Sequence, residues 1–565
     1  MEALEKRLEN QQEENARSVP WQSVLFLFIL AFLTWFAFLG YRDLRDPDEG
    51  RYAEIPREMV ATGDWLTPRL NGFKYFEKPP LNYWGTALFY KMLGTDQGVS
   101  RLWCAGLGFL GILWTFWLGQ RLFGTREALY AALFLTSSLL YFAMGHMHTL
   151  DMGTSVFMTF GIGALLLAQS QRQNPGQVRN WMLVAWGSLA AATLSKGPMG
   201  VVLPAAAVTL YSLWQRDWAL WRHLHLGKGL LFFLLLTAPW FVAVSLRNPE
   251  FPDFFFIREH WLRYTTTIHS RNASNFYFIP VLLAGSLPFM ARAVTALARP
   301  AFAWRPADAG TFAPLRLLWV YIVFIFLFFS LSSSKLIPYI LPVFPPLALL
   351  VGHHLVRIDP ENVRLDLRIL AVMTAILVGV AMLPDIIAHK SRLTPEILAQ
   401  FRWWLLGGGG ILAGGMLLVR HFQYQGKQAV ITLAITALLA FQTIHAGYQT
   451  TSPVYSARQL ATAMAPFVQS GTPVYSVDCF YHSLPFYLGQ NVTLVRYKGE
   501  LDFGIDQEPQ HWISGMEAFY QQWRQAPRAV AVFHLRDGLF QQAQKELSPL
   551  RVIYQDTIRI AVAKP

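Results

Sequence analysis

Long apolar segments recur along the 565-residue chain. The first, residues 21–40, reads WQSVLFLFILAFLTWFAFLG and carries no charge. A run of about 20 apolar residues is enough for a helix to cross a bilayer. The pattern predicts about thirteen membrane-spanning helices, centred on residues 21–40, 101–123, 128–145, 153–169, 181–194, 200–214, 229–246, 276–291, 317–331, 337–356, 369–384, 403–419 and 430–446. A further amphipathic segment, residues 81–94, is too short to span and is expected to be interfacial or re-entrant.

The pattern changes after about residue 447, where short strand-like segments alternate with helical ones. Strands are predicted at PVYSV (473–477), VTLVRY (492–497), AVAVFHL (529–535), RVIYQD (551–556) and RIAVAK (559–564). Helices are predicted at residues 456–469, 515–525 and 537–547. This alternation predicts a small three-layered α/β domain. It contains no phosphate-binding glycine loop or metal cluster, so structural support or acceptor docking is favoured over catalysis.

Composition and charge agree with a polytopic membrane protein. The chain is 53% hydrophobic and 15% charged, whereas soluble proteins carry about 25% charged residues. The first apolar segment lacks a small-residue cleavage site, so it is not expected to be a signal peptide. The net charge of +12 fits Lys and Arg in cytoplasmic loops, or a surface that attracts anionic lipid. The two cysteines are not expected to form a disulfide.

The distribution of basic loops predicts the topology. Every second short connection is rich in Lys and Arg, and by the positive-inside rule these connections face the cytoplasm. We therefore expect residues 1–20 to be a cytoplasmic segment and residues 21–447 to be a transmembrane domain. The first long loop, residues 41–98, and a C-terminal domain, residues 448–565, are expected on the far side of the membrane.

The stretch RDPDEGRYAEIPREM begins where the first apolar segment has ended. Asp46 is a candidate N-cap for a helix that starts at Pro47, with Asp48 in its first turn, where the helix dipole favours a negative charge. Pro56 is expected to kink or restart this helix. Its apolar positions are Tyr52, Ile55, Met59 and Val60, and its polar positions on the opposite side are Arg51, Glu54, Arg57 and Glu58. The spacing predicts an interfacial helix, which either carries chemistry or only anchors the loop.

Further along, NGFKYFEKPPLNYW places a lysine among aromatic residues. Pro79 favours an extended Lys78, so that Glu77 and Lys78 are expected to point to different sides. An ammonium flanked by Tyr75 and Tyr83 above the membrane suits a lipid phosphate. The alternative is an ordinary surface ion pair. The preceding segment from Gly63 contains two glycines and a proline, and is expected to be a mobile coil.

Other residues on the far side add to this candidate anion site: Asp151, Lys196, Glu259, His260, Arg263, His269 and Lys335. Cations from several loops on one face favour binding of an anion. A zinc site at Glu77 with His260, or at His146 with His148, is a weaker hypothesis because no regular ligand spacing supports it.

Residues 47–79, PDEGRYAEIPREMVATGDWLTPRLNGFKYFEKP, closely resemble the first periplasmic loop of the lipid A 4-amino-4-deoxy-L-arabinose transferases. SKLIPYILPVFPPLAL (334–349) and FYFIPVLLAGSLP (276–288) are similar to later segments of that family. The resemblance covers essentially the whole chain, and it is specific in the first loop and loose in the tail. It implies a C-type glycosyltransferase fold of about 13 transmembrane helices with a periplasmic C-terminal α/β domain, related to the protein O-mannosyltransferases.

The resemblance also implies an activity: transfer of the aminopentose from undecaprenyl phosphate to a phosphate of lipid A, at the periplasmic face of the inner membrane. This modification would confer resistance to polymyxin and other cationic peptides. By motif position, Asp48 matches the essential loop aspartate, Lys78 and Arg263 match the residues that hold the donor phosphate, and Tyr339 matches a tyrosine of the donor cavity. The remaining residues expected to bind donor or acceptor are Arg51, Tyr52, Tyr75, Glu77, Asp151 and Lys196. No cofactor is expected to be required, with zinc as the alternative, and the protein is expected to act as a monomer.

Two other functions remain open from the sequence. A polyprenyl-phosphate-mannose protein O-mannosyltransferase would use a related lipid carrier, but its hydroxyl acceptor would require a general base. A lipid transporter or flippase would also have many spans. Its ionisable residues should lie near the middle of the membrane, whereas these residues collect at one face.

Overall fold

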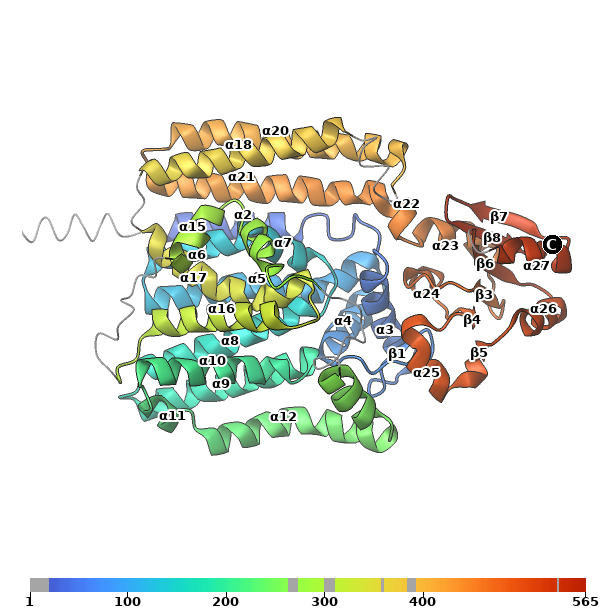
Figure 1. Cartoon of the computed structure of the whole chain (residues 1–565), viewed down its shortest axis with the longest axis horizontal. Coiled ribbons are helices and arrows are strands. Elements are labelled where there is room, and N and C mark those ends of the chain that lie inside the picture. The colour runs from blue at the N-terminus through green and yellow to red at the C-terminus, as the bar shows by residue number, and fades with distance from the viewer. Residues whose placement is uncertain (1–19, 263–272, 299–309, 357–359, 384–392, 536–537) are drawn as a thin grey trace, which may run out of the picture. The chain divides into compact units, whose positions relative to one another are not determined.

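The computed structural model describes residues 20–262, 273–298, 310–356, 360–383, 393–535 and 538–565 (Figure 1). The chain forms two compact units. The first, called the helical unit, comprises residues 1–37, 104–383 and 402–445. The second, called the loop–tail unit, comprises residues 38–103, 384–401 and 446–565. The first long loop therefore packs in one unit with the C-terminal residues.

Helices make up the helical unit, with α5, α20 and α21 extending into the other unit. Their bounds are α2 (Trp21–Phe36), α5 (Gln97–Leu122), α6 (Thr125–Ser137), α7 (Leu139–His146), α8 (Asp151–Ser170), α9 (Pro175–Lys196), α10 (Met199–Gln215), α11 (Ala219–Arg222), α12 (Leu226–Arg247), η1 (Asp253–Leu262), α14 (Phe278–Gly285), α15 (Met290–Ala298), α16 (Pro314–Leu331), η2 (Ile337–Val343), α17 (Phe344–Leu355), α18 (Pro360–Met382), α20 (Pro395–His421) and α21 (Gly426–Gly447). Each apolar segment predicted from the sequence overlaps one of these helices or a broken pair of them.

Length and hydropathy decide which helices can cross a membrane on their own. In the described residues, 8 helices pass this test, or up to 9 if α6 and α7 form one span, and α2 and α10 are shorter apolar helices. The pair α6 and α7 bends by 61°. At this bend the hydroxyls of Thr136, Ser137 and Ser138 donate to carbonyls four residues earlier. Such bonds compete with the helical ladder and favour bending.

The helices of this unit differ in how deeply they are packed. Helix α8 packs against α9, and 83% of its most apolar stretch is buried. In α12, only 22% of the most apolar stretch is buried. Figure 1 shows these long helices running side by side. On α12 the leucines 230, 231, 234 and 235 are exposed. An apolar surface of this kind is stable in contact with lipid, so α12 has the character of a lipid-facing helix.

The loop–tail unit contains the elements of the first loop and of the C-terminal domain. Those of the first loop are α3 (Asp48–Thr62), β1 (Arg69–Leu70), β2 (Phe73–Lys74) and α4 (Leu81–Leu93). Those of the tail are η3 (Tyr448–Thr451), α22 (Ser452–Tyr455), α23 (Arg458–Met464), η4 (Ala465–Phe467), β3 (Val474–Val477), α24 (Ser483–Leu488), β4 (Thr493–Val495), η5 (Gly499–Leu501), α25 (Asp502–Gln507), η6 (Pro509–His511), β5 (Trp512–Ile513), α26 (Met516–Gln525), β6 (Val530–His534), α27 (Leu539–Leu547), β7 (Arg551–Gln555) and β8 (Arg559–Ala563).

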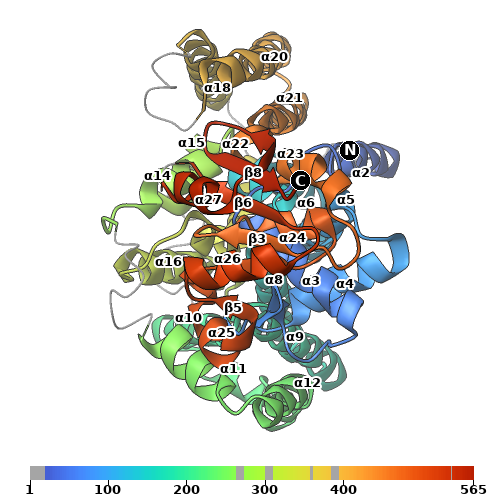
Figure 2. The same cartoon turned by 90° about the vertical axis from the view of Figure 1, so that its right-hand side faces the viewer.

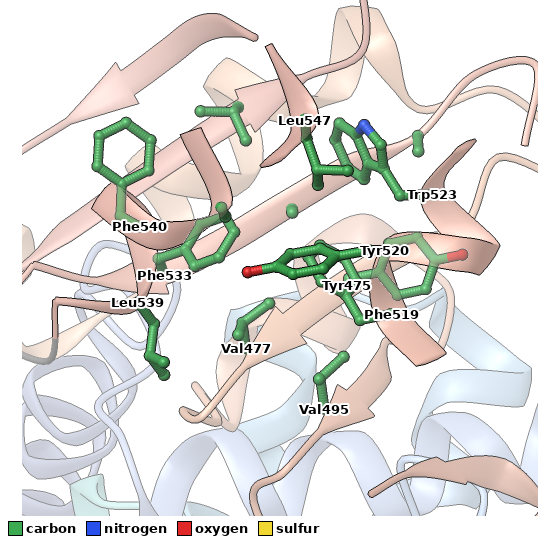
Figure 3. Packing of buried hydrophobic residues seen from close by; sticks show 14 of the residues in the cluster. Tyr475, Val477, Val495, Phe519, Tyr520, Trp523, Phe533, Leu539, Phe540 and Leu547 are labelled. Atoms are coloured by element: carbon green, nitrogen blue, oxygen red, sulfur yellow. The ribbon is translucent and has the colours of Figure 1, made fainter. Parts of the chain in front are cut away.

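A six-stranded mixed sheet forms the centre of the tail. The strand order is β5-β4-β3-β6-β8-β7, with β5, β4, β3 and β6 parallel, and β8 antiparallel to both neighbours. Figure 2 views this sheet with α26 and α27. These two helices cover one face through a cluster that includes Phe519, Trp523, Phe533 and Phe540 (Figure 3). The five predicted strands and three predicted helices are confirmed, while β5, α24 and α25 were not foreseen.

The structure also replaces part of the expected coil between Gly63 and Lys78 with a hairpin. Strands β1 and β2 pair antiparallel, and the connecting residues Asn71 and Gly72 both have positive φ, 54° and 82°. Two such residues form a turn whose twist matches that of an antiparallel pair, and Asn-Gly is a preferred sequence for it. The expectation of a continuous coil is therefore wrong for residues 69–74.

Candidate functional site

The candidate site residues of the first loop begin at the N-terminus of α3. Asp48 is the first residue of this helix, and its side chain is 55% exposed. Its Oδ1 accepts a hydrogen bond of 3.1 Å from Nη1 of Arg51, one turn later. The guanidinium of Arg51 thereby orients the carboxylate. Asp48 is thus oriented by a neighbour yet accessible to a ligand.

Asp46 does not cap this helix, contrary to the prediction. Its carboxylate accepts hydrogen bonds from the backbone nitrogen and the hydroxyl of Ser483, at 2.7 and 3.0 Å. Burial raises the pKa of Asp46 to about 6, against the lowering effects of His482 and the Ser483 hydrogen bonds. Gly50 permits this approach, because a Cβ there would lie 2.5 Å from the Ser483 nitrogen. The carboxylate therefore joins the first loop to α24 of the tail.

The polar side of α3 is buried, whereas the predicted interfacial helix would expose it to water. Glu54 is 0% exposed and Glu58 is 4% exposed. The reason is that α4 and α24 both pack against α3. Glu49 is also buried, and it forms a bidentate ion pair with Arg101 at 2.8 and 2.9 Å. The charged residues of this stretch mainly form ion pairs and hydrogen bonds inside the protein. Pro56 lies within one continuous helix.

Arg51 links Asp48 to the C-terminal domain. Its Nε donates to Oε1 of Glu500 at 2.8 Å, and its Nη2 donates to the other oxygen. Nε2 of His482 lies 2.7 Å from the same Glu500 Oε1. Burial alone would raise the pKa of Glu500, but the hydrogen bond and charge of His482 and the charge of Arg51 outweigh it and lower the pKa to about 2. No motif or regular spacing in the sequence points to Glu500 or His482, because both lie in a tail without motifs.

Several predicted residues gather around Arg51. Burial lowers the pKa of Arg51, but the electrostatic effects of Tyr75, Glu500, Tyr52 and Glu77 outweigh burial and raise it well above its usual value. The hydroxyl of Tyr75 is buried, and no partner for it occurs among the described residues. Burial raises the pKa of Tyr75 well above its usual value, so this phenol remains a neutral hydrogen-bond donor. The structure thus brings Arg51, Tyr52, Tyr75 and Glu77 together.

Lys78 and Glu77 point toward each other rather than to different sides. The chain bends at these two residues, so that Nζ of Lys78 donates to the Glu77 carbonyl at 2.7 Å and lies 4.0 Å from Oε2 of Glu77. The Lys78 side chain is 12% exposed and that of Glu77 is 24% exposed, so this ion pair is largely buried. Tyr83 is buried and its ring stacks on Tyr52, with centroids 6.3 Å apart.

A second group of predicted residues lies in the helical unit. Asp151 begins α8, Lys196 ends α9, and Tyr339 belongs to η2. Lys196 forms an ion pair with Asp151, and its Nζ lies 4.8 Å from the centre of the Tyr339 ring. The side chains of Asp151 and Lys196 are 15% and 14% exposed. The first loop and three distant helical segments therefore each contribute predicted site residues, which lie in two different units.

The remaining candidates are Arg263, which is expected to hold the donor phosphate, its neighbours on the same face, and the possible zinc ligands. Arg263 and His269 lie outside the described residues, as does the side chain of His260. Glu259 and Lys335 are buried, and Nζ of Lys335 donates to the carbonyl of Ser332. Both ring nitrogens of His146 contact backbone carbonyls, of Phe142 at 2.7 Å and Trp35 at 2.6 Å. His146 is therefore not placed to bind zinc, and no cluster of three potential metal ligands occurs in the described part of the chain.

Two family models match separate parts of the chain. The model for "Dolichyl-phosphate-mannose-protein mannosyltransferase" matches residues 77–242, and that for "Aminoarabinose transferase C-terminal domain" matches residues 460–564. The structure of ArnT from Cupriavidus metallidurans bound to undecaprenyl phosphate has a TM-score of 0.88 and 33% identity, and the match covers 96% of this chain and 98% of that one. This chain belongs to the undecaprenyl phosphate-α-4-amino-4-deoxy-L-arabinose arabinosyl transferase family.

Curated members of the arabinosyl transferase family show the same relationship. The protein of Erwinia tasmaniensis is 32% identical over 329 residues, or 57% of each chain. That of Shewanella sediminis is 30% identical over 407 residues, or 69% of each chain. The chain spans 57 to 61% of the length of the first three curated relatives that it matches. Family membership confirms the resemblance read from the first loop, and with it the C-type glycosyltransferase fold carrying a C-terminal α/β domain.

Proposed function

We propose that this protein transfers 4-amino-4-deoxy-L-arabinose from undecaprenyl phosphate to a phosphate group of lipid A. The observation that supports this most strongly is the likeness, over nearly the whole chain, to an arabinosyl transferase structure that holds undecaprenyl phosphate. The match of residues 460–564 to an aminoarabinose transferase domain supports the same sugar. The reaction takes place at the periplasmic face of the inner membrane and protects the cell against polymyxin and cationic peptides.

The transfer exchanges one bond at the anomeric carbon for another. The bond between this carbon and the donor phosphate oxygen breaks, and undecaprenyl phosphate leaves with the electron pair. An oxygen of the acceptor phosphate forms the new bond, converting a monoester into a diester. Because a phosphate monoester is largely ionised near neutral pH, it needs orientation more than deprotonation. An ionised Asp48 then positions the acceptor or stabilises positive charge developing on the sugar.

The departing phosphate requires positive charge around it. Lys78 and Arg263 hold the donor phosphate and stabilise the charge that develops there, as preorganised cations do in enzyme sites. Tyr339 lines the donor cavity, and its contact with the Asp151–Lys196 pair supports a donor-binding role for all three. Arg51, Tyr52, Tyr75 and Glu77 bind donor or acceptor near Asp48.

The acceptor and the carrier fix the surroundings of this chemistry. Undecaprenyl phosphate and lipid A are both amphiphiles, so the protein acts from within the membrane. It acts there as a monomer. The positive charges of Lys78 and Arg263 allow transfer without a cofactor. A zinc ion held by Glu77 and His260 is the alternative arrangement, and loss of activity on chelation with recovery on adding zinc distinguishes the two.

A second candidate function is protein O-mannosylation, because residues 77–242 match the mannosyltransferase model. A protein hydroxyl is a poor nucleophile until a base removes its proton. Asp48 would have to serve as that base, yet its Oδ1 is already engaged by a hydrogen bond from Arg51. The geometry therefore favours an acceptor that is already ionised.

Reconstituted transfer tests the proposal. The purified full-length protein, in vesicles containing lipid A and undecaprenyl-phosphate-linked aminoarabinose, is expected to yield aminoarabinosyl lipid A and free undecaprenyl phosphate in equal amounts. Asp48→Asn serves as the inactive control. Transfer to an added peptide in place of lipid A, with a mannosyl donor, would overturn the proposal in favour of the second candidate.

A further inference from the structure

The β1–β2 hairpin is attached at its tip and base to the C-terminal domain. The side-chain amide of Asn71 donates to the Val492 carbonyl and accepts from the Val492 nitrogen, both at 2.8 Å. Arg69 forms two hydrogen bonds with Glu508, at 2.9 and 3.0 Å. Three residues separate β2 from Lys78. The attachment of the hairpin therefore limits where the segment Tyr75–Lys78 can lie.

A third attachment joins the hairpin tip to α3 through a buried acid. Oε2 of Glu58 accepts a hydrogen bond of 2.9 Å from the Gly72 nitrogen. Glu58 follows Glu54 by one helical turn, and both are buried. Arg57 donates two hydrogen bonds of 2.6 Å to Glu54. The guanidinium of Arg57 is therefore bonded to Glu54, and it acts on Glu58 only through its charge.

The second oxygen of Glu58 indicates the protonation state. Its Oε1 is buried, and no hydrogen-bond partner for it as an acceptor occurs in the described part of the chain. Burial raises the pKa of Glu54 against the lowering effects of Arg57 and of the neighbouring Glu58 carboxyl. Two carboxyl groups can hydrogen-bond only if one carries a proton. A proton on Oε1 of Glu58 satisfies this otherwise orphaned atom and supplies the bond.

The groups around Glu58 come from every element packed against it. On α3 these are Glu54 and Arg57, and on α4 the titratable group is Tyr90, whose hydroxyl donates to the Ala53 carbonyl at 3.3 Å. The hairpin presents backbone nitrogens, and the segment after α24 presents Asn491, which accepts from Nη2 of Arg57 at 3.4 Å. Burial, followed by the charge of Glu54, raises the pKa of Glu58 to about 8 against the lowering effects of Arg57 and the hairpin nitrogens.

We propose that Glu58 is a positioning residue whose protonated carboxyl, donating to Glu54 and accepting from Gly72, fixes the hairpin and thereby the Tyr75–Lys78 segment. The effect on catalysis rests on the proposed function, whereas the effect on the hairpin does not. Loss of the proton places a second carboxylate beside Glu54 with only Arg57 to compensate, and like charges at this spacing repel. This repulsion displaces the Glu58 carboxylate, which is the acceptor of the Gly72 hydrogen bond, and so weakens the attachment of the hairpin tip to α3.

The direction of the pH dependence follows from the raised pKa. Between the ordinary value of 4.5 and about 8, the folded protein holds a proton that the unfolded chain has released. Stability contributed by this group is therefore full at low pH and is lost as pH rises through about 8. One pH unit above its pKa, about nine tenths of the Glu58 carboxyl groups are ionised.

Hydrogen exchange of the full-length protein in nanodiscs tests the attachment directly. Exchange of the amides of residues 69–78 is measured at pH 6.5 and pH 9 and divided by the intrinsic rate at each pH. In the wild type we expect protection to fall severalfold at pH 9. In Glu58→Gln we expect protection to be equal at both pH values, because the amide donates to Glu54 and accepts from Gly72 without titrating. Glu546→Gln, an exposed acid of α27, is the matched control and should behave as the wild type does.

A second variant keeps the test decisive if Glu58→Gln folds poorly. Glu54→Gln releases Arg57 to pair with Glu58, so it should also remove the loss of protection at pH 9. In the wild type, kcat for aminoarabinose transfer should also fall between pH 6.5 and pH 9. This fall should disappear in both variants, with KM for lipid A nearly unchanged. An equal alkaline loss of protection in wild type and both variants would overturn the inference. Absence of transfer with the exchange pattern intact would overturn only the proposed function.

Discussion

Replacing Glu500 with Gln separates the C-terminal domain's electrostatic role from its shape. Glu500 holds Arg51 through two hydrogen bonds and receives a third from His482, and Arg51 in turn orients Asp48. Glutamine preserves the volume and one acceptor oxygen but removes the charge. We therefore expect Glu500→Gln to loosen Arg51 and disorder the Asp48 carboxylate without disturbing the packing of the sheet.

The lowered pKa of Glu500 gives the size of the stability cost. The Glu500 pKa is lowered from 4.5 to about 2, and that difference corresponds to about 3 kcal/mol of folding free energy near pH 7. Because the pKa is lowered on folding, the contribution is full above pH 4.5 and is lost as pH falls toward 2. Near pH 3 it should have decreased to about 1 kcal/mol.

The assay combines thermal unfolding with kinetics. Glu500→Gln should lower the melting temperature at pH 7 and do so much less at pH 3, while Glu517→Gln, an exposed acid on α26, should change neither. A misplaced catalytic group typically costs about 10- to 100-fold in rate, so kcat should fall by that factor with a smaller change in KM. Wild-type kcat in a folded Glu500→Gln protein would refute the chain of contacts as the support of Asp48.

Three further predictions follow from the contacts of the other site residues. Lys78→Ala should lower transfer by about 100-fold or more while the protein stays folded, and near-normal turnover would remove Lys78 from the site. Lys196→Met should destabilise the protein by about 1–3 kcal/mol, because Asp151 is left without its cation, and adding Asp151→Asn should restore part of the loss; an additive double mutant would contradict the pairing. Structures with and without undecaprenyl phosphate should differ in the backbone of residues 75–78 while residues 69–74 superimpose, and superposition of the whole segment within coordinate error would exclude this rearrangement.

The apolar segments and the tail strands could be predicted because each is a local pattern. Residues 474–477 and 530–534 are short runs rich in valine, and both form strands as predicted. The hairpin at Asn71–Gly72 had an equally local signal, the Asn-Gly pair, which the glycine and proline content of the surrounding segment obscured. The break between α6 and α7 was harder to foresee, because an apolar run does not reveal where side-chain hydroxyls will compete with the helical ladder.

The site was predictable only as far as its motif residues. Asp48 and Lys78 stand in a sequence specific enough to be recognised, and Asp48 takes its expected place in the first helical turn. The roles of Asp46 and Glu58 depend on which elements cover α3, and no periodicity within the helix contains that information. Glu500 comes from a segment more than 400 residues away, so its partner could be found only from the three-dimensional structure.

Mass spectrometry of lipid A tests the central claim most directly. Lipid A is extracted from cells that have no aminoarabinose transferase of their own. These cells express either this protein or its Asp48→Asn variant at equal levels. We predict that the wild-type protein adds the mass of one aminoarabinose residue to a phosphate of lipid A, and that the variant adds none. Unmodified lipid A from cells that contain the folded wild-type protein and the undecaprenyl-phosphate-linked donor would contradict the claim.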